Sequence, residues 1–119
     1  MIGDSLTPDL IQKALDGTWQ RQKAIANNIA NHETPGFKAS KVSFEQALQR
    51  EISLGNKVKD AKIKVFTDYS GEERADGNNV NLESENIDMA KTQIQYQYLT
   101  RAMTDMYARL RYAISEGKK

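Results

Sequence analysis

The stretch that decides the fold is Ala26–Lys38, which reads Ala-Asn-Asn-Ile-Ala-Asn-His-Glu-Thr-Pro-Gly-Phe-Lys. Its asparagines are mediocre helix formers, because the side-chain amide competes for nearby backbone groups. Pro35 disfavours the α region at Thr34 and has no N–H to donate, so an arriving helix should end at about Asn31. Pro35 and Gly36 then fit the centre of a type II turn, whose third residue needs a positive φ. This stretch predicts a helix end followed by a fixed turn.

Upstream of this turn the sequence predicts one long helix. Thr7 suits the N-cap and Pro8 suits the first helical position. From there a stripe recurs at alternating spacings of four and three, formed by Ile11, Leu15, Thr18, Gln22, Ile25 and Ile29. The spacing indicates a helix that buries one narrow face and runs to about Asn31, roughly 35 Å long.

The C-terminal part carries the clearest helical pattern. From Asn86, or a turn earlier, to about Glu116 the chain has no proline or glycine. Seam positions recur at spacings of three and four, as in a coiled coil: Met89, Thr92, Tyr96, Leu99, Met103, Met106, Leu110 and Ala113. A helix of roughly 45 Å exceeds what the first helix can cover, so part of this seam is expected to meet other chains. Off the seam, a second contact surface is expected at Ile94, Tyr98, Tyr107 and Ile114.

The connection between these helices is more polar. Ser43 and Gln46 fit a capping box, which predicts a short helix over residues 39–52. Residues 57–81 combine a short β-like alternation with turn signals, which predicts a mobile insertion that holds at most one short hairpin. Four lysines are interpreted as protection of a solvated strand edge rather than as a phosphate site: Lys57, Lys59, Lys62 and Lys64.

Composition excludes several classes of function. Seventeen basic and sixteen acidic residues give a net charge of +1, so nothing points to nucleic acid or an anionic membrane as a partner. The chain has no cysteine, which excludes disulfides and thiolate chemistry. The longest apolar runs have only three residues, as in Ala24–Ala26, so we expect neither a membrane span nor a cleavable signal peptide.

No pattern of residues indicates catalysis. His32 is the single histidine, and one imidazole without cysteine or regularly spaced carboxylates does not make a zinc site. No glycine-rich phosphate cradle occurs. We therefore expect no catalytic residue, no metal and no cofactor, and an enzyme is the least favoured class.

Two parts of the chain resemble the flagellar rod and hook axial proteins. The first is the motif after the N-terminal helix, formed by Asn28, Ile29, Ala30, Asn31, Thr34, Pro35, Gly36, Phe37 and Lys38. The second begins at Val80–Glu85, continues through Met89–Ala90 and Gln93–Gln97, and is similar to the C-terminal helix of proximal rod members of the family. Asn86 departs from the family pattern, where an apolar residue is expected.

We therefore expect a mainly α fold. Two long terminal amphipathic helices pack as an antiparallel, coiled-coil-like hairpin, with a short helix and a small, partly mobile β/loop insertion. The expected parts are residues 1–38 with the helix and turn motif, 39–81 with the insertion, and 82–119 with the C-terminal helix, both termini forming one core domain. Helix and subunit packing is expected at Ile11, Leu15, Ile25, Ile29, Met89, Tyr96, Leu99, Met103, Met106, Leu110 and Ala113.

The resemblance implies a structural subunit of the proximal rod of the bacterial flagellar basal body. Such a subunit would be exported through the flagellar type III apparatus, lie in the periplasm and transmit torque. The implied partners are copies of itself, other rod proteins such as FlgC, the basal-body adaptor FliE and the export apparatus. The alternative is a soluble helical adaptor or export chaperone that binds a partner helix along the methionine-rich stripe.

Overall fold

The computed structural model describes residues 7–117, which form three α-helices, a short 3-10 helix and a two-stranded sheet. In chain order the elements are α2 (Pro8–Ala30), β1 (Ser40–Ser43), α3 (Glu45–Ser53), η1 (Val58–Asp60), β2 (Lys64–Thr67) and α4 (Leu82–Gly117). The predicted mainly helical class is confirmed. None of the helices within residues 7–117 has the length and hydropathy that crossing a membrane requires.

Both ends of α2 lie where the sequence places them. The Leu10 N–H donates to Thr7 Oγ1 at 3.2 Å, and Pro8 occupies the first turn. Asn31 is the C-cap residue, and its N–H donates to the carbonyl of Asn27 at 3.1 Å. The helix therefore ends one turn before the proline that would have broken it.

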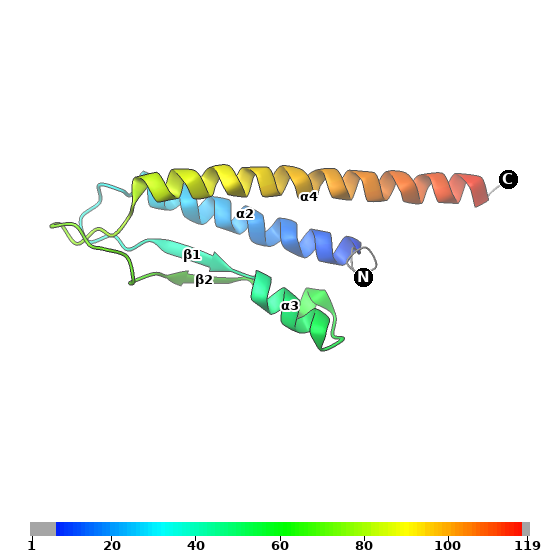
Figure 1. Cartoon of the computed structure of the whole chain (residues 1–119), viewed down its shortest axis with the longest axis horizontal. Helices are drawn as coiled ribbons and strands as arrows, with labels where there is room; N and C mark the ends of the chain where they lie inside the picture. The colour runs from blue at the N-terminus through cyan, green and yellow to red at the C-terminus, as the bar shows by residue number, and fades with distance from the viewer. Residues whose placement is uncertain (1–6, 118–119) are drawn as a thin grey trace.

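Helix α4 lies beside α2, runs in the opposite direction and extends well beyond it (Figure 1). It has 36 residues against 23 in α2, which corresponds to roughly 54 and 34 Å of helix. The buried residues of α4, Glu85 and Thr92, lie in its first half, and every described residue from Tyr107 onward is exposed. The result is an elongated molecule of 69 × 28 × 18 Å.

The small sheet lies on the other side of α2. β1 is placed between α2 and β2 (Figure 1), and the two strands pair in antiparallel register, with Ser40 opposite Thr67 and Ser43 opposite Lys64. Beneath α2, one cluster of buried apolar side chains joins α2, β1, α3 and the segment after η1: Ala24, Val42, Phe44, Leu48 and Ala61.

Two predictions for the connection are wrong. The helix expected over residues 39–52 begins only at Glu45, and no capping box forms, because Ser43 lies in β1 and the N-cap is Phe44, without a side-chain cap. The strand expected around Val65 is present as β2, but it pairs with β1 and not within a hairpin of residues 57–81. Both errors have the same cause. A strand of four residues forms because it pairs with a strand distant in sequence, and no local pattern shows that pairing.

Candidate functional site

Asn28 connects α2, β1 and α4 through its side-chain amide. The residue is fully buried, and its Oδ1 accepts the Ser40 N–H while its Nδ2 donates to the Ser40 carbonyl, both at 2.9 Å. The same Nδ2 lies 3.2 Å from Glu85 Oε2 on α4. The partners of the Asn28 amide are therefore a strand backbone and a carboxylate.

Glu85 is a carboxylate in the first turn of α4 with only 3% of its surface exposed. A buried charge is costly unless it is paired and hydrogen-bonded. Here the Asn28 amide donates to one oxygen, and Lys41 Nζ on β1 lies 3.7 Å from the other. These contacts compensate the carboxylate and fix the start of α4 against the motif.

The turn after α2 has the predicted form. The Phe37 N–H donates to the Thr34 carbonyl at 3.2 Å, and Gly36 has a φ of +74°. The Thr34 hydroxyl donates to Asn31 Oδ1 at 3.0 Å, which links the turn to the helix cap. His32 Nδ1 lies 2.8 Å from the Ile29 carbonyl, so the single histidine also serves the helix end.

Two buried asparagines from the segment before α4 hold this turn from the other side. Asn78 Nδ2 donates to the carbonyls of Asn31 and Thr34, both at 2.8 Å. Asn79 Oδ1 accepts the Ala39 N–H at 2.8 Å, while its Nδ2 donates to the carbonyl of Asp68 at 2.7 Å. Sequence reasoning missed both roles, because the Asn-Asn pair was interpreted as a turn in a mobile insertion. The signal that could have indicated burial was the apolar residue Val80 beside them, which is 1% exposed in the structure.

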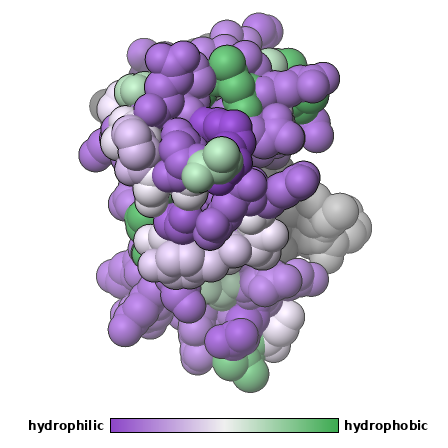
Figure 2. Space-filling model, turned by 90° about the vertical axis from the view of Figure 1, so that its left-hand side faces the viewer, coloured by the Kyte–Doolittle hydropathy of each residue, from purple (hydrophilic) through white to green (hydrophobic). Residues whose placement is uncertain are grey.

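Charged side chains complete the outer layer of this end. Arg74 donates to the carbonyls of His32 and Val80, and Lys38 donates to the Gly77 carbonyl and lies 3.0 Å from Glu73. Figure 2 shows this end of the molecule to be mainly hydrophilic. Polar contacts thus hold the motif in place. They fix the angles at which α2, β1 and α4 meet.

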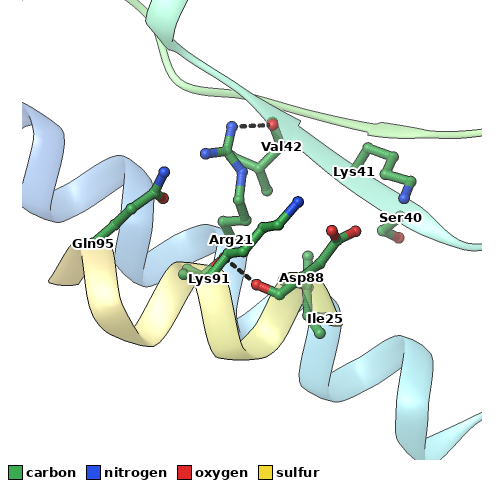
Figure 3. A pocket seen from close by; sticks show the side chains of 10 residues that line it. Arg21, Ile25, Ser40, Lys41, Val42, Asp88, Lys91 and Gln95 are labelled. Atoms are coloured by element: carbon green, nitrogen blue, oxygen red, sulfur yellow. Dashed lines mark hydrogen bonds between the residues drawn. The ribbon is translucent and has the colours of Figure 1, made fainter. Parts of the chain in front are cut away.

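A cleft lies between α2, β1 and α4, and Figure 3 shows Arg21, Lys41, Asp88 and Lys91 around it. Arg21 is already occupied, since it donates to both oxygens of Glu45 and to the Val42 carbonyl, each at 2.7 Å. Its hydrogen bond to Glu45 is the main reason that the pKa of this carboxyl is lowered. No group of three or more potential metal-ligating side chains occurs among residues 7–117. Arg21 thus joins α2 to β1 and α3, and Lys41 of β1 lies beside Glu85 of α4.

The apolar seam of α4 is only partly covered. Of the residues predicted for packing, Ile11 and Ile25 are buried, and the half-buried ones are Leu15, Ile29, Met89, Tyr96, Leu99, Met103 and Met106. Leu110 is 45% exposed, and Ala113 is exposed as well. A groove between the start of α2 and this part of α4 is lined by Ile11, Tyr98, Ala102, Met106, Leu110 and Ala113 together with charged residues. Apolar surface is therefore left open along the distal half of α4.

A helix–turn motif, a long helix that returns antiparallel to the first and a partly uncovered apolar seam together define an elongated, mainly helical protein. Residues 12–38 match the family model described as flagella basal body rod protein. The flagellar basal body rod protein FlgB of Bacillus subtilis strain 168 is 32% identical, over 91% of this chain and 92% of the relative. FlgB of Borrelia hermsii is 36% identical, over 80% of this chain and 85% of the relative. FlgB of Escherichia coli K12 is 24% identical, over 89% of this chain and 91% of the relative.

The chain belongs to the FlgB family of flagellar basal body rod proteins. It is therefore a structural component of the rod, and the family is not one of enzymes.

Proposed function

We propose that this chain is a self-assembling subunit of the proximal rod that transmits torque through contacts of its terminal helices. The observation that carries the proposal is the uncovered apolar face of α4 in a member of a rod-protein family. Tyr107, Leu110 and Ile114 recur at spacings of three and four, and 51%, 45% and 53% of their respective surfaces are exposed. Full burial of one such side chain is worth roughly 1.5–3 kcal/mol, so neighbours that cover this face would stabilise an assembly.

In this proposal α2 and α4 form the coiled-coil-like hairpin, and residues 39–81 are an insertion that braces it. The seam residues of the distal half of α4 then contact the next subunit in a head-to-tail manner. A contact of this kind that does not close into a ring generates a helical tube. A tube of interlocked helices is suited to carry torque along its axis.

The proposed partners are copies of this chain, other rod proteins such as FlgC, the adaptor FliE and the flagellar export apparatus, with the rod in the periplasm. The relatives are flagellar basal body rod proteins, which supports the basal-body rod as the location. No observation favours the alternative of an adaptor or export chaperone over a rod subunit.

Leu110→Asp is expected to abolish motility, because it would place an unpaired carboxylate in the proposed contact. The matched control is Ala108→Asp, an exposed position about 200° around the same helix. Swimming in soft agar, in a strain whose own copy is deleted, measures the effect, with circular dichroism of each purified chain as a check on folding. Normal swimming by the Leu110→Asp strain would refute a contact at this face.

A further inference from the structure

The backbone of β2 has one edge that faces away from β1. The Asp68 N–H donates to the Ala39 carbonyl at 2.8 Å, which makes these two residues a hydrogen-bonded pair in the β1–β2 register. Hydrogen-bonded and non-hydrogen-bonded pairs alternate along an antiparallel ladder. The backbone N–H and C=O groups of Val65 and Thr67 must therefore point outward, away from β1.

The opposite edge of the sheet is finished by side chains of α2. The outward groups of β1 belong to Ser40 and Val42 by the same alternation. Asn28 bonds both the N–H and the carbonyl of Ser40, and Arg21 donates to the Val42 carbonyl. This edge presents no template for another strand, since the helix already occupies it.

The outer edge of β2 has no such cover. All four residues of β2 are exposed, and no hydrogen bond among residues 7–117 caps the outward groups of Val65 or Thr67. In Figure 1, β2 lies on the side of β1 that faces away from both long helices. Apolar surface accompanies the open edge, with Val65 54%, Phe66 40% and Tyr69 73% exposed.

The charges around this edge select the kind of strand that it can accept. Four lysines and one aspartate lie in residues 57–64, and Lys64 Nζ lies 5.8 Å from the centre of the Phe66 ring on the same strand. A second copy of β2 in parallel register would bring Lys62 and Lys64 against the same two lysines, which is unfavourable in a cross-strand pair. An acidic strand would instead find complementary charge at the end of the edge that carries Lys62 and Lys64.

We propose that the outer edge of β2 binds an extended, acidic segment of another protein by strand addition. The segment hydrogen-bonds the outward groups of Val65 and Thr67, places carboxylates near Lys62 and Lys64, and covers the exposed apolar side chains. Main-chain bonds supply the affinity in this mode of recognition, and side-chain charge supplies the selectivity. The proposal is independent of the helix contacts proposed for the rod.

The test is an NMR titration of the isotope-labelled full chain with a capped synthetic peptide that alternates glutamate with valine. We expect the amide signals of Val65 and Thr67 to shift and their hydrogen exchange to slow. Val65→Pro removes one outward N–H without removing a bond to β1, and it should weaken binding about fivefold. A charge reversal at Lys62 and Lys64, both to Glu, should abolish binding. This second variant tests the proposal even if the proline variant fails to fold.

The matched control for the charge reversal is Lys13→Glu with Lys91→Glu, which changes the net charge equally but lies on α2 and α4. This control should bind the peptide as the wild type does. Unchanged amide signals at β2, or equal binding of a peptide with lysine in place of glutamate, would overturn the proposal. Self-association of the wild type in sedimentation velocity that Val65→Pro abolishes would also overturn it, because the occupant would then be a second copy.

Discussion

At the scale of single residues, the side chain of Asn28 hydrogen-bonds the edge of β1 as a neighbouring strand would. Its amide presents a donor and an acceptor to Ser40 with the spacing of a peptide group, and the residue is 0% exposed. A buried amide of this kind is worth most when every partner is satisfied, and no described buried side-chain polar atom lacks one. The family motif is thus a structural joint between α2 and β1.

Asn28→Asp is expected to lower the free energy of unfolding by about 2–4 kcal/mol. The carboxylate cannot donate to the Ser40 carbonyl, and it would lie against the buried carboxylate of Glu85. Urea unfolding followed by circular dichroism measures the change. The control Asn27→Asp makes the same substitution at an adjacent exposed position and should cost less than about 0.5 kcal/mol. Equal losses in the two variants would contradict the assigned role of Asn28.

Gly17 is a second residue whose identity is set by packing. A Cβ at this position would lie 2.4 Å from Cδ1 of the Phe44 ring, which is 4% exposed in the core. Glycine inside a helix costs roughly 1 kcal/mol relative to alanine, so the sequence accepts a weaker helix in return for close contact with the ring.

Gly17→Ala is expected to destabilise the chain by a net of about 1–2 kcal/mol, because the strain of overpacking exceeds the gain in helix propensity. The same substitution in a Phe44→Leu background should be neutral or stabilising. A double-mutant cycle of urea unfolding measures this reversal of sign. A loss of the same size in both backgrounds would show that the ring is not the cause.

At the scale of elements, the long helices could be predicted and the short strands could not. The bounds of α2 follow from Thr7, Pro8 and the asparagines before Pro35, all of which act within a few residues of their effect. β1 has only four residues, and its last one, Ser43, is the first residue of the apparent capping box. Its strand conformation depends on β2 and on Asn28, which no local pattern could reveal.

The candidate site was predicted in part for the same reason. The motif residues were found because they are consecutive in the chain. Their partners Glu85, Asn78 and Asn79 were missed, since a buried polar residue looks like a surface residue in sequence. Only the fold shows that the side chains of Glu85 and Asn78 bond the motif and that the Asn79 side chain bonds Ala39 directly after it.

The contact between α2 and α3 predicts a pH dependence of stability. The hydrogen bond from Arg21 lowers the pKa of Glu45 below its ordinary value of 4.5 in the folded chain. A depressed folded-state pKa contributes stability that is present above the unfolded-state pKa and is lost as the pH falls through the folded-state pKa. The contribution is modest, because more than half of the Glu45 side chain is exposed.

Between about pH 5 and pH 3 the wild type should therefore lose more of its unfolding free energy than Glu45→Gln does. Thermal unfolding of both chains across this range measures the difference. The two chains keep all other carboxylates in common, so those contributions cancel. Parallel pH profiles would contradict the assigned pair.

At the scale of the whole molecule, α4 is too long for the rest of the chain to cover. Roughly 20 Å of helix extends beyond the length that α2 can match. The distal half of α4 carries apolar side chains whose continued exposure to water would be unfavourable. In the proposed rod, neighbouring subunits would cover this part of α4.

The most direct test is the chemical accessibility of position 110 in the free and the assembled protein. The chain has no cysteine, so Leu110→Cys introduces a single thiol. In isolated protein this thiol should react quickly with a maleimide, whereas in purified basal bodies it should be protected until the rods are denatured. Equally fast labelling of the free chain and the intact rod would contradict the account.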